Sequence, residues 1–595
     1  MPFQVSPGVQ VTERDLTTVV PNVATTIGAF AGQFQWGPVL ERVTITNENE
    51  LVKTFGEPND ATAEYFWSAA NYLAYSNNLL VARAVNSDAI NAVVGDHAGA
   101  DNGAAGVART VKNGDDYDGL ESSIATEKNL FIAKYPGDLG NSLEAYMIDS
   151  AGWDAGDTIT HAPTLAIKNK FRAIFNAPPG TSADVAAAGG SNDEVHVLVI
   201  DKNGLFTGTA GEVLEAHAFL SKARDAKKFD GSSNYVRTVL RNESQYVWLG
   251  SPLEITALSE DASPAVVAGS LKGVNTTFKR INGETDSEKV IGGHLAGGLA
   301  GSAITAGQEE AAFMLYLDPE TVDVSLLITG PCDPVTGKKV IDDIAAVRKD
   351  CVAFVSPQKD TVVNSLAATR VANIEGEKTA FGSSNYGIMD NAWKYQYDRY
   401  RDLFLYVPMN PDIAGLCART DLSHDSWYSP AGLTRGTIKN IVKTSWEPNK
   451  AERDVLYQSS INPITTQQGA GVILFGDKTM QTTPTAFDRI NVRRLFIVLE
   501  KAIANAAKAM LFEFNDEFTR AQFVNIVAPF LREIQGRRGI TDFKVVCDST
   551  NNTGQVIDSN NFVGDIFVKP TRSINFIQLN FVASRSDVSF SEIGG

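Results

Sequence analysis

Residues 455–514 decide how this chain folds. The first part, 455–480, reads VLYQSSINPITTQQGAGVILFGDKTM, and the last part, 487–514, reads FDRINVRRLFIVLEKAIANAAKAMLFEF. An extended polar segment holds Asn462-Pro463, Gly469 and Gly471 mark a turn, and the apolar run 472–475 is typical of a short buried strand. A long helix led by Asn491 follows. A strand followed by a helix predicts a mixed α/β architecture for this part of the chain.

The length and composition indicate a globular protein of several domains. A chain of 595 residues is too long for one hydrophobic core, so we expect about three or four domains. The apolar share of 43% and the charged share of 21% are typical of soluble proteins. No apolar run reaches the length of a membrane span, and the first ten residues lack the basic and apolar regions of a secretion signal. We therefore expect no membrane insertion.

Charge and cysteine usage exclude two further classes of protein. The net charge of −18 argues against a protein that coats nucleic acid, because such a protein presents a basic surface to phosphates. Residues 484–595 carry 13 Lys and Arg against 12 Asp and Glu, so the acidic surplus lies in the rest of the chain. The four cysteines stand far apart without a C-x-x-C pair, which predicts buried free thiols in a reducing compartment rather than zinc ligands or disulfides.

Several motifs together resemble those of contractile-tail sheath proteins. The C-terminal block carries the most specific ones: N-P-I at 462–464, a Gly turn, a strand that ends in G-D-K-T at 476–479, and I-N-V-R-R-L at 490–495. Further matches are S-P-G-V-Q-V-T-E at 6–13, A-F-A-G at 29–32 with W-G-P at 36–38, A-K-Y-P-G-D-L-G-N at 133–141, and W-Y-S-P-A-G at 427–432. Residues 195–200 and 212–235, which include a helix-like stretch from Glu212 to Ser221, resemble the larger, T4-like branch of that family.

The resemblance implies mechanical assembly rather than catalysis. Sheath subunits of that family stack as hexameric rings around an inner tail tube, and contraction drives the tube through the host envelope for genome ejection. The implied partners are therefore further copies of this chain, the inner tail tube protein, and the baseplate and tail terminator proteins. No direct contact with nucleic acid is implied. The implied location is the phage tail in the virion, with the host cytoplasm as the place of assembly.

The implied architecture is a multidomain α/β fold with α+β parts. It has an α/β sheath core, β-rich outer insertion domains, and a C-terminal α+β domain with extended N- and C-terminal strands. The expected domains are a linking arm at 1–22, a discontinuous core at 23–86 and 365–483, an outer insertion domain at 87–190, a second outer α/β domain at 191–364, and an inner, tube-contacting domain at 484–595. Alternating helix and strand patterns over 308–356 predict a parallel sheet. Arg83 lies inside an apolar strand, so we expect it at a sheet edge or opposite an acid.

Two terminal segments have strand patterns without a local partner. Val9 and Val11 alternate with polar residues, and Ile577, Leu579 and Phe581 share one face of a long predicted strand. Because an unpaired strand exposes backbone donors and acceptors, these five residues are candidates for pairing with neighbouring subunits.

The helix predicted at 490–513 carries a basic stripe. Arg494, Lys501 and Lys508 recur every seven residues, a step that drifts by only about 20° around a helix, and they lie roughly opposite its apolar side. One interpretation is a solvated helix face. The other is a docking surface for acidic groups on the inner tube, held by individually weak charge pairs.

The search for chemistry yields no catalytic, cofactor-binding or metal-binding residue. The six histidines show no metal-ligand spacing, and no Ser-His-Asp set or G-x-S-x-G elbow is present. His424 stands between Asp421 and Asp425 and could be an oriented base, although a structural or exposed role fits better. The P-G-x-x-G-N stretch at 136–141 lacks the Lys-Ser/Thr of a phosphate loop and predicts a structural turn.

Two alternatives to a phage tail sheath stay open. The first is the sheath of a bacterial contractile injection system, although one long chain with large insertions favours a phage tail. The second is an α/β hydrolase-like or nucleotide-dependent enzyme, which would need a clustered site.

Overall fold

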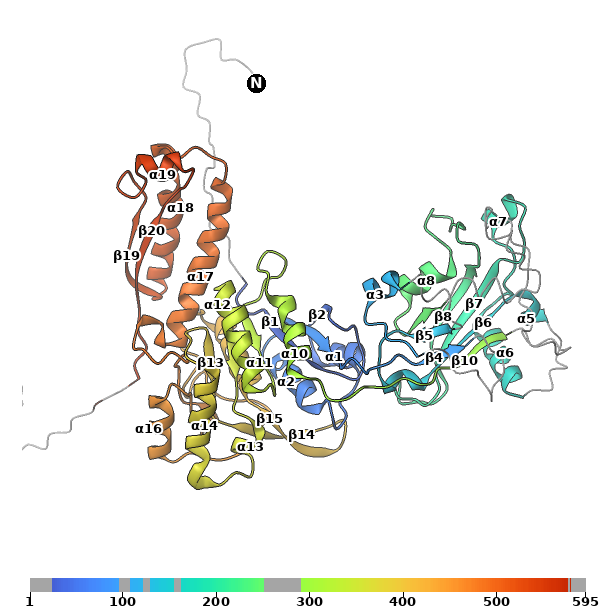
Figure 1. Ribbon diagram of the computed structural model, residues 1–595, viewed down its shortest axis with the longest axis horizontal. Coiled ribbons are helices and arrows are strands. Elements are labelled where there is room, and N and C mark those ends of the chain that lie inside the picture. Colours follow the sequence, from blue (N-terminus) through green and yellow to red (C-terminus); the bar gives the residue numbers. More distant parts are fainter. Residues whose placement is uncertain are drawn as a thin grey trace, which may run out of the picture.

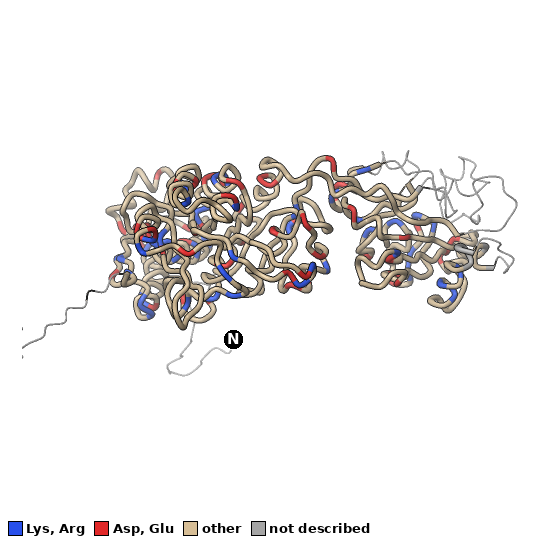
Figure 2. Tube along the Cα trace, turned by 90° about the horizontal axis from the view of Figure 1, so that it is seen from below, with Lys and Arg blue, Asp and Glu red and all other residues tan. Residues whose placement is uncertain are grey.

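The computed structural model describes residues 24–95, 108–120, 129–154, 162–250, 290–575 and 578. Figure 1 shows an elongated molecule in which a core domain lies between a helical C-terminal domain and an outer domain of sheets. Figure 2 shows basic and acidic residues interleaved along this body in that view. The fold is therefore multidomain with mixed helices and sheets, as predicted. Among the described helices, none is both long enough and apolar enough to cross a membrane.

The core domain is built on a mostly parallel sheet whose strands come from distant parts of the chain. Within the described residues its strand order is β13-β12-β11-β1-β3-β2. The strands are β1 (Gly28–Gln33), β2 (Arg42–Ile45), β3 (Leu79–Ala84), β11 (Leu326–Ile328), β12 (Val352–Val355) and β13 (Gly387–Met389). β2 is antiparallel to β3, and the other neighbours are parallel. Every residue of β1 is buried, as expected for a parallel strand that is covered on both faces.

Helices and small antiparallel sheets complete the core. The helices are α1 (Glu48–Phe55), α2 (Ala63–Leu73), α10 (Ala306–Phe313), α11 (Pro334–Lys339), the π-helix η5 (Val340–Ala345), α12 (Ala346–Arg348), α13 (Lys359–Val362), α14 (Ala367–Phe381), α15 (Asn410–Ser423) and α16 (Lys450–Gln458). The remaining strands are β14 (Trp393–Asp398), β15 (Leu403–Pro408), β16 (Lys443–Thr444), β17 (Ile464–Gln467) and β18 (Gly471–Leu474). Local sequence sets several helix starts: Asn47 accepts from the Glu50 N–H at α1, and Thr305 and Gln308 form a capping box at α10.

Two expected domain boundaries differ from the structure. β11 and β12 pair with the core strands, so the residues from α10 onward belong to the core and not to a second outer domain that ends at 364. β6 (Leu143–Ile148) pairs with β7 (Glu194–Asp201), so the expected division at 190 separates two neighbours in one sheet. Pairing between distant strands leaves no local signal in the sequence, which is why pattern alone misplaced both boundaries.

The outer domain contains two sheets in the described part of the chain. One has the order β10-β6-β7-β8 and the other has the order β4-β5-β9. Their further strands are β4 (Val93–Gly95), β5 (Asn129–Ala133), β8 (Glu212–Ser221), β9 (Val247–Leu249) and β10 (Val290–His294). The accompanying helices are α3 (Gly114–Gly119), α5 (Ser150–Asp154), α6 (Ala162–Ile174), α7 (Ala183–Ala187) and α8 (Val236–Glu243).

The helix-like interpretation of Glu212 to Ser221 is wrong, because this segment is strand β8. It runs antiparallel to β7 along its whole length. Two register shifts, at Val195/Val197 and at Val199/Ile200, interrupt the pairing. Such irregularities break the period-two alternation by which a strand is recognised from sequence.

Arg83 lies neither at a sheet edge nor opposite an acid. β3 runs between β1 and β2, and the Arg83 guanidinium is buried. It donates hydrogen bonds to four backbone carbonyls, those of Phe34 (2.9 Å), Gln35 (3.1 Å), Gly37 (2.9 Å) and Pro136 (2.7 Å). The first three follow β1 in the core, whereas Pro136 belongs to the P-G-x-x-G-N stretch. Arg83 therefore ties the outer domain to the core.

The P-G-x-x-G-N stretch is a structural turn, as predicted. Gly137 has a φ of 147°, and a Cβ there would lie 2.7 Å from the Gln35 carbonyl oxygen, so this close approach requires glycine. The Asn141 side chain donates to the Gly298 carbonyl at 2.9 Å and accepts from the Gly298 N–H at 2.8 Å. The motif thus fixes the joint between two domains.

The C-terminal domain combines two long helices with a sheet that has two strands in the described residues. Its elements are α17 (Ile490–Ala507), the 3-10 turn η7 (Lys508–Met510), α18 (Glu517–Gly536), β19 (Ile540–Val546), α19 (Gly554–Asp558) and β20 (Asp565–Pro570). Leu495, Leu499, Phe523, Val527 and Leu531 lie in its core. The helix predicted at 490–513 is confirmed as α17 and η7. Most of the long predicted strand that holds Ile577, Leu579 and Phe581 lies outside the described residues.

Candidate functional site at the root of the C-terminal segment

The residues considered for catalysis are engaged in structural contacts or exposed. Asp421 forms an ion pair with Arg494, and Asp425 forms one with Arg537. His424 between them is exposed. The four cysteines are buried free thiols, as predicted. Over the described ranges, no group of His, Cys, Asp and Glu could hold a metal ion.

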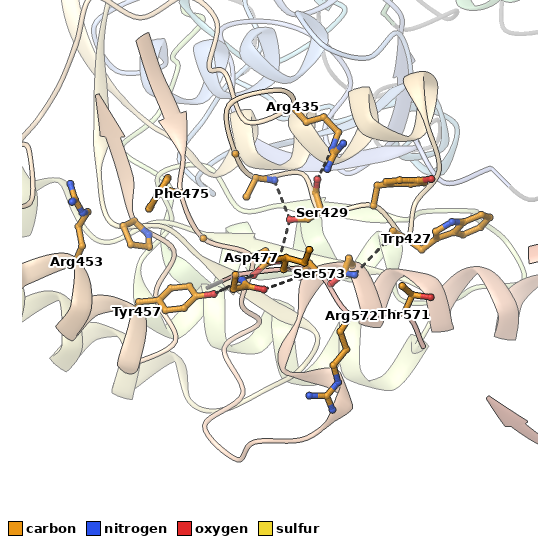
Figure 3. A pocket seen from close by; sticks show the side chains of 18 of the residues that line it. Trp427, Ser429, Arg435, Arg453, Tyr457, Phe475, Asp477, Thr571, Arg572 and Ser573 are labelled. Atoms are coloured by element: carbon orange, nitrogen blue, oxygen red, sulfur yellow. Dashed lines mark hydrogen bonds between the residues drawn. The ribbon is translucent and has the colours of Figure 1, made fainter. Parts of the chain in front are cut away.

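A cavity of about 580 Å³ lies where the C-terminal segment leaves the folded body (Figure 3). Residues from the core, from α17 and from the segment 571–575 line it. Many of the lining side chains are aromatic or basic: Trp427, Tyr428, Arg435, Lys450, Arg453, Tyr457, Phe475, Arg538 and Arg572. Asp477 lies among them and is only 2% exposed.

The N-P-I motif holds the turn that carries Asp477. The buried Asn462 side chain accepts from the Lys478 N–H at 2.7 Å and donates to the Lys478 carbonyl at 2.8 Å. A Cβ at Gly476 would lie 2.9 Å from Asn462 Oδ1, so glycine is needed at this position. Gly469 and Gly471, with φ of 82° and 77°, form the predicted turn between β17 and β18. The motif therefore fixes the position of the Asp477 carboxylate.

Five side chains from four separate segments donate hydrogen bonds to the Asp477 carboxylate. Arg489 (2.9 Å), Tyr457 (3.3 Å) and Asn575 (2.8 Å) donate to Oδ1. Ser429 (3.1 Å) and Ser573 (2.9 Å) donate to Oδ2. Figure 3 shows three of these donors, Ser429, Tyr457 and Ser573, around Asp477. We call Asp477 and these five donors the Asp477 cluster; it joins the core, the start of α17 and the C-terminal segment at one carboxylate.

Burial shifts the titration of the groups beside Asp477. It raises the pKa of the Tyr457 hydroxyl, and the nearby Asp477 carboxylate adds to this shift, so Tyr457 stays protonated and can donate. Burial also lowers the pKa of Lys478, whose ammonium lies 4.4 Å from the centre of the Tyr457 ring. Hydrogen bonds to an ionised acceptor are roughly twice as strong as neutral ones, so the donors around a carboxylate hold it more firmly than they would hold an amide.

The structure separates the three residues of the predicted basic stripe. Arg494 is 4% exposed, pairs with Asp421 and donates to the Cys417 carbonyl at 3.4 Å, so its assignment to an exposed stripe is wrong. Lys501 pairs with Asp323 of the core. The residues from Ile490 to Leu495 are all buried. The core packs against the side of α17 that the seven-residue spacing of the basic residues predicts to be exposed to solvent. Contact of Lys501 or Lys508 with an inner tube stays a prediction.

The residues predicted for strand exchange, Val9, Val11, Ile577, Leu579 and Phe581, lie outside the described residues. The structure does describe where their segments join the body. The Ala24 carbonyl accepts from the Ser325 hydroxyl at 3.0 Å and lies 3.5 Å from the Lys501 ammonium. At the other end, Asn575 donates to Tyr457 as well as to Asp477.

Sequence reasoning missed most of the Asp477 cluster. The motifs at 427–432 and 476–479 contain Ser429 and Asp477 but do not show that the two meet. Arg489, Ser573 and Asn575 lie in segments whose patterns point to other roles. One feature of the sequence could have indicated the cluster. Asp477 lies in a tight turn next to an apolar strand, and a buried acid needs hydrogen-bond donors, which had to come from elsewhere in the chain.

Comparison with known proteins identifies the family. The model of the phage tail sheath protein central domain matches residues 320–480, that of the phage tail sheath C-terminal domain matches 482–584, and that of the tail sheath protein Gp18 domain III N-terminal region matches 25–84. The tail sheath protein of Enterobacteria phage T4 is 35% identical to this chain, and that of Vibrio phage KVP40 is 34% identical. Each of these alignments covers 99% of both chains. The chain belongs to the phage tail sheath protein family.

This tail sheath protein is thus a structural component of a contractile phage tail. The central-domain model begins at 320, so it groups β11 and β12 with the later core strands β13 to β18. Among solved structures, the sheath tail protein Lin1278 from Listeria innocua is 12% identical, with 92% of this chain and 96% of that chain covered and a TM-score of 0.49.

Proposed function

We propose that this sheath protein polymerises as stacked hexameric rings around an inner tail tube, and that contraction of the polymer drives the tube through the host envelope for genome ejection. Its partners are further copies of the chain, the tube protein, and the baseplate and tail terminator proteins. It assembles in the host cytoplasm and ends in the virion tail. Support comes from relatives at 34% and 35% identity over their whole length, which are tail sheath proteins.

The Asp477 cluster is the observation that carries the mechanical part of this proposal. A polymer linked by terminal strands transmits load through the points where those strands leave the body. Ser573 and Asn575 are bound at such a point by a carboxylate that also binds Arg489. A hydrogen bond to a charged group contributes about 1.5–3 kcal/mol, so the root of the C-terminal segment resists local opening.

The terminal segments complete the proposal. Residues 1–15 and the segment 573–583 pair with strands of neighbouring copies, and Lys508 of η7, which follows α17, faces the inner tube. Main-chain hydrogen bonds of added strands supply the affinity of such links without requiring a large apolar interface.

Electron microscopy of purified protein tests this proposal. The full chain should form tubes, whereas a variant without residues 1–15 should remain a folded monomer. A short tag inserted between Asn102 and Gly103 is the matched control, because it leaves both terminal segments intact and loop extension costs only about 0.6 kcal/mol per doubling of length. Normal tubes from the deletion variant would contradict the role of the N-terminal segment, and failure of the full chain to form tubes would contradict the proposed function itself.

A further inference from the structure

Two aromatic surfaces lie at opposite ends of the body formed by the core and the C-terminal domain. The first, which we call the aromatic tip, is the loop before α18 together with the first turn of α18, where Phe512, Phe514 and Phe518 are 104%, 82% and 77% exposed. The second, the tyrosine face, is one side of the β14–β15 hairpin and consists of Tyr395, Tyr397, Phe404 and Tyr406. In Figure 1 the far ends of α17 and α18 lie at the top, and β14 and β15 lie at the bottom.

The aromatic tip has a fixed shape. Asn515 donates to the Asn561 carbonyl at 2.8 Å and accepts from the Arg520 guanidinium at 3.1 Å. Asp516 caps α18 by accepting from the Thr519 N–H at 2.8 Å. Phe512 has a φ of 72°, a left-handed conformation that costs a residue with a side chain about 1–2 kcal/mol. The loop therefore holds large apolar rings in solvent at an energetic cost, which is typical of an interaction site.

The tyrosine face is the unpartnered side of its hairpin. Tyr395 stands opposite Tyr406 and Tyr397 stands opposite Phe404, with ring centroids 4.7 Å and 5.2 Å apart within these pairs. The alternate residue Gln396 points the other way, where it accepts from Asn71 of α2 at 2.9 Å. Tyr397 and Phe404 are nearly half exposed. The four rings thus form one continuous apolar surface that the described residues leave open.

The charges at the two surfaces are complementary. Glu513 and Glu517 are exposed beside the rings of the aromatic tip, and neither has an ion-pair partner within the described residues. Lys443 is exposed beside the tyrosine face, with its ammonium 4.9 Å from the centre of the Tyr395 ring, and it too lacks a carboxylate partner in the described part of the chain. Asp402 also lies at this face, at the turn of the hairpin, where it accepts from the Tyr397 hydroxyl at 2.6 Å, whereas Lys443 lies beside Tyr395. Two tips brought together would place acids against acids, whereas a tip seated at the Tyr395 end of the tyrosine face places acids near an amine.

We propose that the aromatic tip of one copy docks on the tyrosine face of a second copy. This inference rests on the proposed function, because it describes a contact inside a polymer of this chain. A contact between different surfaces at opposite ends of a subunit is heterologous, so it repeats from copy to copy and builds a helical array rather than a closed pair. In this contact the phenylalanines pack against the tyrosine rings, and Glu513 or Glu517 pairs with Lys443.

The apolar half of the contact is tested by the critical concentration for polymerisation of the full chain, measured by sedimentation with electron microscopy of the product. Phe512→Ser/Phe514→Ser should raise that concentration by at least about tenfold, because two rings no longer become buried. Leu205→Ser/Phe229→Ser is the matched control, since both residues are exposed in the outer domain. The control should polymerise like the wild type. Unchanged thermal unfolding of the monomers shows that the variants fold.

The charged half is tested by a swap. Glu513→Lys/Glu517→Lys and Lys443→Glu should each raise the critical concentration several-fold, and the two changes combined should restore it to within about twofold. Tip variants that polymerise like the wild type, or a combined variant that is no better than its parents, would overturn the inference. Tip variants that polymerise normally alone but fail around inner tubes would assign the tip to the tube and overturn it as well. If the wild type forms no polymer, the proposed function fails instead.

Discussion

Replacing Asp477 with Asn tests whether the Asp477 cluster holds the C-terminal segment. Asn keeps the shape of the side chain, but it removes the charge and turns one acceptor oxygen into a donor. Ser573 and Asn575 donate to the carboxylate at 2.9 Å and 2.8 Å. Such bonds contribute about 1.5–3 kcal/mol each when the acceptor is charged and about 1 kcal/mol when it is neutral. The segment should therefore lose about 2 kcal/mol of local stability, which shifts its opening equilibrium about 30-fold.

Limited proteolysis measures this opening directly. The peptide bond after Arg572 is a trypsin site at the root of the segment, and cleavage of a transiently opened site follows the population of the open form. In native buffer the initial rate of cleavage after Arg572 should rise about 30-fold in Asp477→Asn. Global stability should fall by about 1–2 kcal/mol, because the 20% exposed Arg489 loses its counter-ion. A urea titration measures this second effect separately.

Asp454→Asn is the matched control for this experiment. Asp454 lines the same cavity and is exposed, and it has no ion pair within the described residues. Its variant should be cleaved at the wild-type rate. Equal cleavage rates in Asp477→Asn and the wild type would refute the reasoning, because the carboxylate would then contribute nothing to holding the segment.

Three further predictions concern buried charges. Arg83→Met leaves four carbonyls without their donor and should lower the free energy of unfolding in urea by about 4 kcal/mol or more; a loss below about 1 kcal/mol would mean that water replaces the guanidinium. The side chains of Lys394 and Asp412 are fully buried and form an ion pair at 2.9 Å, so Lys394→Met should lower the free energy of unfolding by about 3–5 kcal/mol. Lys394→Met/Asp412→Leu should recover most of that loss, because no unpaired charge remains. A double variant as unstable as the single one would show that the loss comes from packing. Burial raises the pKa of Asp390 to about 8, so the folded protein holds a proton that the unfolded chain releases between about pH 4 and pH 8. Stability should therefore fall as pH rises through this window, by up to about 1.4 kcal/mol per unit, and a pH series of urea midpoints for Asp390→Asn should show a smaller slope.

The core and the C-terminal helices could be predicted because their residues carry local patterns. β1 is a continuous apolar run that is buried throughout, and the helical periodicity at 490–510 corresponds to α17 and η7. The turn at Gly469 and Gly471 could likewise be predicted, since glycine favours turns and both residues adopt positive φ. In each case the signal lies within a few residues of the element that it predicts.

The parts that could not be predicted depend on contacts between distant segments. Arg494 falls opposite the apolar side of α17 in sequence, yet the core covers that side and supplies Asp421. A buried arginine in a strand predicts an acidic partner, yet the partners of Arg83 are backbone carbonyls. Every residue has a backbone carbonyl, so the sequence does not indicate which ones Arg83 binds. The Asp477 cluster could not be predicted for the same reason: nothing in the sequence distinguishes its donors from other polar residues, and only the fold brings them together. Buried polar groups predict that partners exist, but not where they are.

Both terminal segments join the folded body along one helix. The Ala24 carbonyl lies beside Lys501, and the Asp477 cluster holds Asn575 beside Arg489, just before α17 begins. From Arg489 to Lys501 the chain covers about 18 Å at 1.5 Å per residue. The first turns of α17 are buried between the core and the C-terminal domain, so this stretch cannot fray without breaking both interfaces. Under the proposed strand linkage, tension on one terminal segment would therefore pass to the other through this helix. The outer domain, attached through Arg83 and the turn at Gly137, stands outside that path.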